Sequence, residues 1–125
     1  MSPKRPRPTD SELAILQVLW RLGPSTVKRV QDALRKETGY TTALKFLQIM
    51  TEKGLVMRDE AARAHVYRAK YSESETQQQL VTGLLRKAFG GSTSKLVMQA
   101  LASRKTSPQE LAEIRRLIES ISQEK

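Results

Sequence analysis

One segment in the first half of the chain decides the predicted fold, and it reads Thr41-Thr42-Ala43-Leu44-Lys45-Phe46-Leu47-Gln48-Ile49-Met50-Thr51-Glu52-Lys53-Gly54. Its apolar residues at positions 43, 46, 47 and 50 recur at the i, i+3, i+4 and i+7 spacing of a helix that lays one face on a core. Gly54 follows where such a helix would end. The opposite face carries side chains that hydrogen-bond to phosphates and base edges, namely Thr41, Thr42, Lys45 and Gln48.

The residues upstream predict a first helix that packs in the same core. Residues 9–12, Thr-Asp-Ser-Glu, have the spacing of a capping box, in which the first and fourth side chains bond to each other's backbone N–H. A wide apolar stripe follows and ends at Gly23-Pro24. Trp20 belongs to this stripe, so it is expected to be a core residue rather than a base-stacking platform.

A second helix is predicted between these two. Ser25 is expected to cap it, and it should run to about Thr38 with Lys28 on its polar side. A short turn then leads into residues 41–54. This order predicts a helix-turn-helix whose second helix enters a DNA major groove, with Lys28 near the phosphates. Taken alone, the polar face of residues 41–54 fits a solvated helix surface equally well.

Two short β-prone runs follow the predicted reading helix. Residues 55–58 and 65–69 alternate in character and are separated by a turn-like stretch, which predicts a two-stranded hairpin. Three helices followed by a hairpin form the winged-helix variant of the helix-turn-helix, with the hairpin as the wing. Arg63 near the tip is the candidate backbone contact, and Arg58 and Arg68 lie on the strands. A purely solubilising role for these arginines is the open alternative.

The last third of the chain predicts three more amphipathic helices, separated by Gly90-Gly91 and by Ser107-Pro108. Such short helices have little core of their own, so their stripes are expected to be buried against a second copy of the chain. A monomer in which they fold back on the winged helix is the alternative. The expected dimerisation residues are Leu80, Leu84, Leu85, Phe89, Leu96, Leu101, Leu111, Ile114, Leu117, Ile118 and Ile121.

The predicted fold class is therefore mainly α, with a winged-helix DNA-binding domain at residues 9–71 and a helical dimerisation domain at residues 72–125. Residues 1–8 combine three prolines with three cations and predict a basic flexible arm. The whole chain has 22 Lys and Arg against 13 Asp and Glu, a net charge of +9, which indicates an acidic polymer as partner. Residues 1–71 hold 14 of these cations and 7 of the acids, so they are expected to form the binding half.

The composition argues against catalysis and against a metal cofactor. There is no cysteine, and the single histidine, His65, cannot by itself build a metal site or a catalytic base network. We therefore expect no enzymatic activity, no cofactor and no metal. No stretch approaches the apolar length of a membrane span, so neither membrane insertion nor a location outside the cytoplasm is expected.

Four motifs together carry a family resemblance. They are TDSELAILQVLW at residues 9–20, TTALK at 41–45, EKGLV at 52–56, and AFGG at 88–91 followed by SKLVM at 94–98. In these motifs the chain resembles the penicillinase-repressor family of winged-helix transcriptional regulators (BlaI/MecI/CopY-like), over nearly all its length from Thr9 onward. The resemblance implies a homodimeric repressor on a palindromic operator, often built on TACA/TGTA half-sites.

Three departures limit what the resemblance implies. The copper-responsive branch has a cysteine cluster that this chain lacks, so metal-triggered release is not implied. In the β-lactam-responsive branch a membrane sensor protease leads to cleavage at an Asn-Phe pair, where this chain has Gln99-Ala100. A sensor protease, or a protease downstream of it, therefore stays an open partner. Leu44 stands where that branch has an arginine, so a different half-site preference is expected.

The leading hypothesis is thus a sequence-specific repressor that binds double-stranded DNA as a homodimer. Two alternatives remain at this point. A non-specific, architectural DNA-binding protein would need only the charge. A winged-helix adaptor for other proteins would bind without regard to salt or DNA sequence, and the basic first half counts against it.

Overall fold

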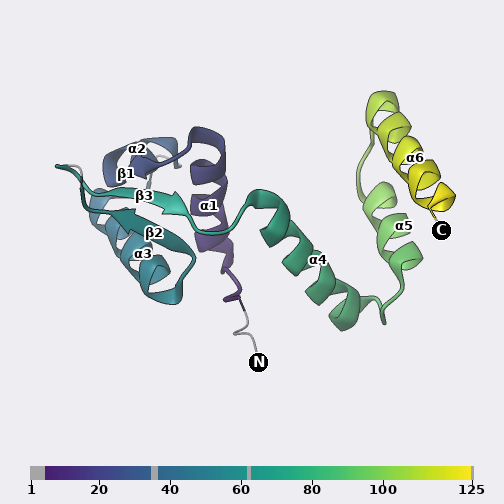
Figure 1. Cartoon of the computed structure of the whole chain (residues 1–125), viewed down its shortest axis with the longest axis horizontal. Coiled ribbons are helices and arrows are strands. Elements are labelled where there is room, and N and C mark those ends of the chain that lie inside the picture. Colours follow the sequence, from purple (N-terminus) through teal and green to yellow (C-terminus); the bar gives the residue numbers. More distant parts are fainter. Residues whose placement is uncertain (1–4, 35–36, 62, 125) are drawn as a thin grey trace. The chain divides into compact units, whose positions relative to one another are not determined.

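The computed structural model describes residues 5–34, 37–61 and 63–124. Contacts divide the chain into two units, residues 1–81 and 82–125. The first unit holds α1 (Asp10–Leu22), β1 (Ser25–Thr26), α2 (Val27–Ala33), α3 (Tyr40–Lys53), β2 (Val56–Asp59) and β3 (Val66–Ala69) (Figure 1). α4 (Glu73–Ala88) begins in this unit, and the second unit continues with α5 (Thr93–Ser103) and α6 (Pro108–Gln123). The predicted class, a winged helix followed by helices, is confirmed. That the units serve as DNA-binding and dimerisation domains stays a prediction.

The amino terminus of α1 is fixed by the predicted capping box and by an ion pair whose carboxylate is buried. The Thr9 N–H donates to Glu12 Oε1 at 2.9 Å, and the Glu12 N–H donates to Thr9 Oγ1 at 3.2 Å. The Glu12 side chain also accepts from Lys53 Nζ at 2.7 Å, which ties the start of α1 to the end of α3. Burial acts to raise the pKa of Glu12, but the hydrogen bonds from Lys53 and Thr9 outweigh it and hold the pKa below its ordinary value.

The sheet has three strands in the order β1-β3-β2, all antiparallel. The hairpin of β2 and β3 was predicted, whereas β1 was not. Ser25 does not cap the second helix, because its backbone pairs opposite Tyr67 and its hydroxyl donates to Gly23 O at 2.8 Å. Thr26 is the cap instead, accepting from the Arg29 N–H at 3.2 Å. The prediction that this helix runs to about Thr38 is also wrong, since α2 ends at Ala33.

The core of the first unit is formed by the apolar faces of α1, α2 and α3 together with buried residues of β2 and β3. Trp20 packs against this core as predicted, and its indole N–H donates to Tyr71 O at 3.0 Å. α3 ends at Gly54, whose φ of +83° is the left-handed conformation that glycine adopts most readily. The buried apolar residues are Ile15, Leu16, Val18, Leu19, Val27, Val30, Ala43, Leu47, Met50, Leu55, Val56 and Tyr67.

Candidate nucleic-acid interface

The polar face predicted for α3 is exposed in the structure. Ala43, Leu47 and Met50 are fully buried, so the helix is held by one side. The side chains proposed to read DNA all lie in solvent, and we call them the reading face: Thr41, Thr42, Lys45 and Gln48. They belong to the first nine residues of α3. Glu52, further along the same exposed side, would repel phosphates, so the charge pattern favours the amino-terminal part of the helix as the part that enters a groove.

Two interactions orient α3 within the first unit. α2 packs across α3 with Val30, which is fully buried. At the other end Lys53 reaches Glu12 of α1. Neither contact uses a side chain of the reading face, so both position the helix and leave the side chains that would contact DNA free of these interactions.

Lys28 lies on the exposed side of α2, as predicted. Its ammonium group pairs with Asp32 at 3.1 Å, one helical turn further on. Both side chains are more than 60% exposed, with values of 68% and 62%. An ion pair this exposed contributes little to stability, so Lys28 can exchange Asp32 for a phosphate at small cost.

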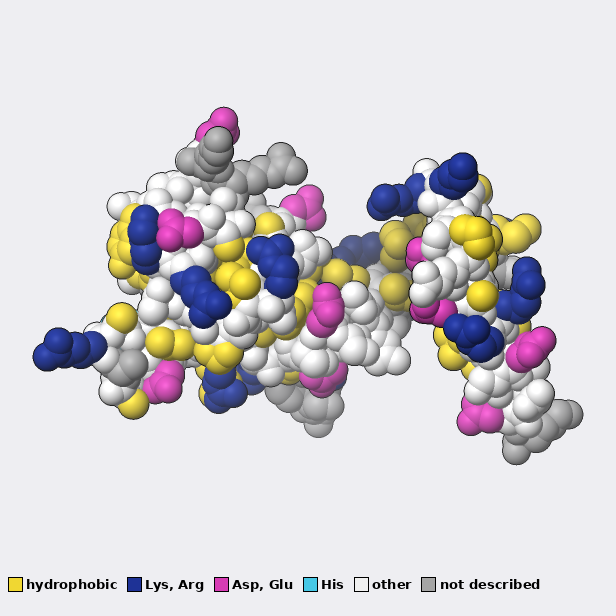
Figure 2. All heavy atoms as spheres, turned by 90° about the horizontal axis from the view of Figure 1, so that it is seen from above, with side chains coloured by type: hydrophobic (Ala, Val, Ile, Leu, Met, Phe, Trp, Pro, Cys, Tyr) yellow, Lys and Arg dark blue, Asp and Glu magenta, His cyan; other side chains and the backbone are white. Residues whose placement is uncertain are grey.

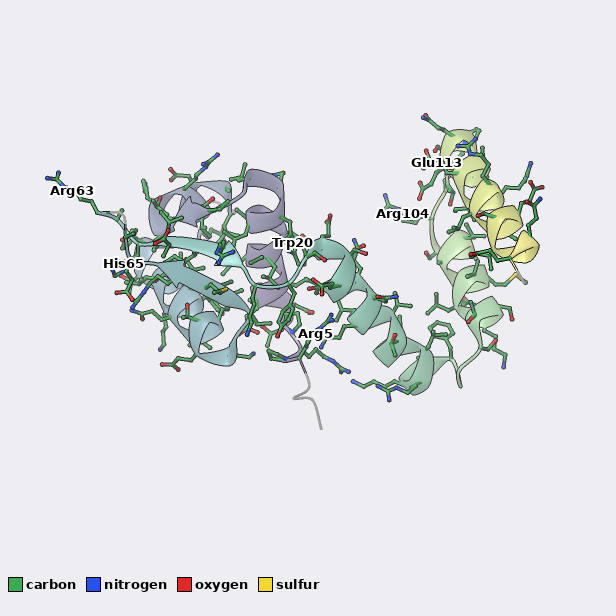
Figure 3. All side chains as sticks on the ribbon, in the orientation of Figure 1. Arg5, Trp20, Arg63, His65, Arg104 and Glu113 are labelled. Atoms are coloured by element: carbon green, nitrogen blue, oxygen red, sulfur yellow. The ribbon has the colours of Figure 1, made fainter. Side chains whose placement is uncertain are left out.

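The wing is the β2–β3 hairpin with its connecting loop. Arg63 is exposed in that loop, and Figure 3 shows its side chain extending from the tip away from the helices. At the start of the loop Asp59 Oδ1 accepts from the Ala61 N–H at 2.9 Å, a turn that closes the strand. Arg63 therefore has the reach that the sequence suggested, at the far end of the hairpin.

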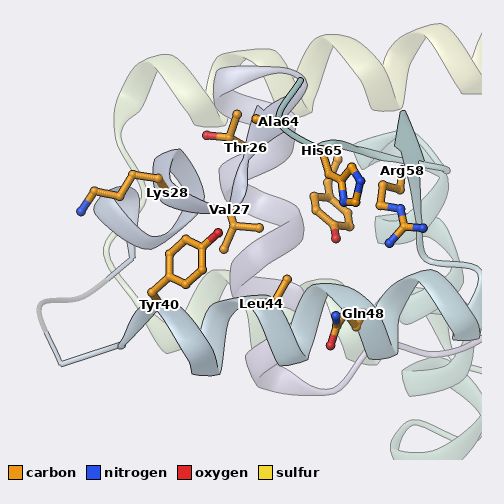
Figure 4. A pocket seen from close by; sticks show the side chains of 10 residues that line it. Thr26, Val27, Lys28, Tyr40, Leu44, Gln48, Arg58, Ala64 and His65 are labelled. Atoms are coloured by element: carbon orange, nitrogen blue, oxygen red, sulfur yellow. The ribbon is translucent and has the colours of Figure 1, made fainter. Parts of the chain in front are cut away.

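A hollow of about 460 Å³ lies between α3, the start of α2 and the wing (Figure 4). We call it the wing hollow. Gln48 of the reading face and Lys28 both line it. The sequence analysis predicted Arg58 as a wing arginine but did not distinguish it from Arg68, and it did not predict that the other lining residues lie together. These other residues are Thr26, Val27, Tyr40, Leu44, Ala64, His65 and Tyr67. The strand alternation was the available signal, since Arg58 lies two residues after the buried Val56.

Arg58 has two close neighbours in the wing hollow. Its guanidinium pairs with Glu60 at 3.2 Å. Glu60 first, and then the Tyr67 hydroxyl, raise the pKa of Arg58 above its ordinary value. The Tyr67 hydroxyl itself is buried and, among the described residues, has no hydrogen-bond partner of normal geometry.

The described part of the amino-terminal arm, residues 5–8, lies against the start of α4. The Arg5 guanidinium donates to Glu75 O at 3.3 Å and stacks 5.1 Å from the centre of the Tyr71 ring. Gln79 Nε2 donates to Arg5 O at 3.1 Å. Residues 1–4 lie outside the described residues, and an arm that reaches DNA stays a prediction.

None of the residues predicted to form a dimer is buried in the single chain. Six of them are exposed: Leu84, Leu101, Leu111, Leu117, Ile118 and Ile121. The other five are only partly buried: Leu80, Leu85, Phe89, Leu96 and Ile114. Figure 2 shows hydrophobic side chains on the surface of the carboxy-terminal helices. α5 and α6 contain no buried residue at all.

Two further features of the described residues concern metal ions and membranes. In residues 5–34, 37–61 and 63–124, no group of three or more His, Asp or Glu is arranged to hold a metal ion. Within the same ranges, no helix has the length and apolar character that crossing a membrane requires.

The three-helix unit, its exposed reading face and the hairpin beside it define a winged helix-turn-helix protein. The chain belongs to the penicillinase repressor family, because the model of that family matches residues 8–120. This confirms the resemblance carried by the four motifs.

Two relatives illustrate this membership. "Transcriptional regulator BlaI" of Mycobacterium tuberculosis is 37% identical over 79 residues, which are 61% of this chain and 54% of that protein. The chain thus spans about half the length of that regulator. "Penicillinase repressor" of Bacillus licheniformis is 23% identical over 118 residues, covering 93% of this chain and 92% of that protein.

Proposed function

We propose that this protein is a transcriptional repressor that binds a palindromic DNA operator as a homodimer. The observation that carries the proposal is the exposed reading face of α3, placed beside the wing on a unit rich in cations. The names of the relatives support it, since one is a penicillinase repressor and the other a transcriptional regulator. Repression then needs only occlusion of a promoter, and no catalytic group takes part.

The reading face would supply specificity, and the surrounding cations would supply affinity. Gln48 reaches base edges from the amino-terminal part of α3, with Thr41 and Thr42 beside it, while Lys45 contacts a nearby phosphate. Lys28 and Arg63 flank the helix on α2 and on the wing, where they would contact phosphates on either side of the groove. Because phosphate contacts release counterions, binding should weaken steeply as salt rises.

A homodimer follows from the apolar surface of the second unit. Helices with no buried residue cannot be stable from their own packing, because short helices rely on tertiary burial. A second copy buries the same stripe by two-fold symmetry and doubles the number of reading faces. Half-sites roughly 10 bp apart, or a multiple of that spacing, would then be read together.

The first test is selection from random duplex DNA by the purified full chain. We expect a palindromic winner, bound at least ~10³ times more tightly than a scrambled duplex when both are titrated by fluorescence anisotropy at two salt concentrations. Equal, salt-steep binding to every duplex would instead establish the non-specific architectural alternative. Absence of salt-dependent DNA binding would leave the adaptor alternative.

Substitutions in the reading face should separate affinity from specificity. Lys45→Ala is expected to weaken binding to all duplexes. The slope of log K against log salt concentration should become shallower by about 1 for each subunit that loses a phosphate contact. Gln48→Ala is expected to relax base preference at one position of each half-site, by about 1–3 kcal/mol of discrimination. The matched controls are Arg21→Ala and Gln17→Ala, which change exposed residues of α1. Unchanged binding and preference in both α3 variants would exclude α3 as the reading helix.

A further inference from the structure

The wing strands carry two arginines, and the strand register places them on opposite faces of the sheet. Arg58 is directly opposite Tyr67, and Met57 is directly opposite Arg68. Paired residues share a face, and successive residues alternate between faces. Arg58 therefore shares the face of Tyr67, which is fully buried. Arg68 lies on the other face with Met57, where both side chains are exposed.

Arg58 is thus the strand arginine that enters the wing hollow. Its side chain is 32% exposed, so neighbouring groups cover most of its surface and the rest stays open to solvent. Figure 4 shows it directed from β2 toward α3, which carries Gln48. His65 of the wing loop and Lys28 of α2 line the same hollow, but Figure 4 shows the Lys28 side chain extending away from it, so Arg58 rather than Lys28 is directed into the hollow.

We propose that Arg58 holds a phosphate of the DNA backbone in the wing hollow, and that Glu60 occupies the same guanidinium while DNA is absent. This rests on the proposed DNA-binding function and adds to it a contact that fixes the distance between the recognition helix and one strand of the duplex. The contact carries no base information. It positions α3 in the groove, as backbone contacts generally do.

Three features select a backbone phosphate as the occupant. Gln48 belongs both to the reading face and to the lining of the hollow, so a duplex that contacts the reading face of α3 passes beside the hollow. The guanidinium already pairs with an anion, since Arg58 Nη2 lies 3.2 Å from Glu60 Oε2. An arginine fork matches the geometry of a phosphate, with which it forms two parallel hydrogen bonds.

Glu60 is well placed to give way to such a phosphate. Its side chain is 63% exposed, so its ion pair with Arg58 is weak in water. Removing the negative charge of Glu60 should therefore free Arg58 and strengthen DNA binding. The gain depends on Arg58, which distinguishes this exchange from a general loss of repulsion between the protein and DNA.

The test uses the full chain and the selected duplex, titrated by anisotropy over a range of salt concentrations. Arg58→Ala should weaken binding about tenfold, and the slope of log K against log salt concentration should become shallower by about 1 per subunit. Arg68→Ala, which removes the same charge from the opposite face, should change affinity much less. Glu60→Gln should strengthen binding several-fold in the native background and leave the affinity of the Arg58→Ala variant unchanged. Equal losses in the two arginine variants would overturn the proposal.

A second measurement locates the phosphate. Single methylphosphonate linkages, which are uncharged, are placed one at a time along each strand of the duplex. At one position per half-site the substitution should weaken the native protein but not the Arg58→Ala variant. If every position weakens both proteins equally, Arg58 holds no backbone phosphate. If inorganic phosphate displaces Arg58 from Glu60 but no linkage couples to Arg58, the hollow is a small-anion site and the proposal fails.

These outcomes are separable from failure of the proposed function. If selection yields no consensus sequence, the operator hypothesis fails, but the contrast between Arg58→Ala and Arg68→Ala can still be measured on any duplex. Arg58→Lys keeps the charge without the fork and should recover only part of the affinity. Thermal melting of each variant shows that the fold is retained, and Arg58→Gln replaces Arg58→Ala if it is not.

Discussion

Replacing both Ile118 and Ile121 with Glu is expected to convert the protein into a monomer and to weaken operator binding at least about 100-fold. The two side chains are 55% and 59% exposed in the single chain. Burying an aliphatic side chain of this size contributes about 1.5–3 kcal/mol, and a two-fold interface buries each residue twice. A carboxylate at these positions would instead need to lose its water, which opposes association.

The measurement is molar mass by light scattering after size-exclusion chromatography, together with anisotropy titration on the selected operator. Gln123→Glu is the matched control, because helix periodicity places Gln123 on the side of α6 opposite Ile118 and Ile121, and the substitution adds a charge without removing apolar surface. It should leave both the dimer and the affinity intact. A double Glu variant that still runs as a dimer would place the interface elsewhere, and a native protein that runs as a monomer at micromolar concentration would contradict the homodimer.

The second large effect is expected on folding. Glu12→Ala should lower the free energy of unfolding by about 2–4 kcal/mol, because it removes half of the capping box and leaves Lys53 without its partner. The lower part of that range is favoured, since the Lys53 side chain is 34% exposed and water can replace part of the lost interaction. Thermal unfolding followed by circular dichroism measures the change, with a decrease in melting temperature of at least about 8 °C.

Asp10→Ala is the control for this substitution. Asp10 is an exposed acid in the same first turn of α1, so its removal tests only the interaction of a charge with the helix terminus. Its effect should stay below about 1 kcal/mol. Equal losses in the two variants would mean that the ion pair between Glu12 of α1 and Lys53 of α3 adds nothing to stability beyond the effect of a charge at the helix terminus.

The same carboxylate predicts how stability depends on pH. The folded-state pKa of Glu12 is lowered, so its contribution is fully present above the unfolded pKa of about 4.3 and is lost as pH falls through the folded pKa. The difference in melting temperature between the native protein and the Glu12→Gln variant should therefore be constant near neutral pH and shrink on acidification below about pH 4. A difference that stays constant down to pH 3 would show that Glu12 titrates alike in both states.

Much of the fold could be predicted because the sequence patterns that specify it are local. The capping box at residues 9–12, the stripe of α3 and its end at Gly54 each depend on side chains within one or two turns of a helix. The same reasoning overextended α2, because Leu34 takes up an extended conformation after Ala33. It also missed β1, since a strand of two residues has no pattern of its own and exists only through its pairing with β3.

The reading face was predictable residue by residue, whereas the wing hollow was not. Exposure of Thr41, Lys45 and Gln48 follows from helix periodicity alone, since buried residues occupy the other side. Which wing arginine faces α3 depends on the register of β2 against β3 and on which side of the sheet the helices cover. If the register of β2 against β3 shifted by one residue, Arg58 would move to the other face of the sheet and a neighbouring side chain would face α3 instead.

The family, the winged-helix class, the basic character of the first half and the polar face of α3 could all be predicted from the amino-acid sequence. Those properties depend on composition, on motifs and on spacings of a few residues. Two other features become visible only in the folded chain. Lys53 pairs with Glu12 across 41 positions of the sequence, and Arg58 rather than Arg68 lies in the wing hollow. Both facts depend on how elements distant in the sequence dock on one another, and no local pattern encodes that geometry.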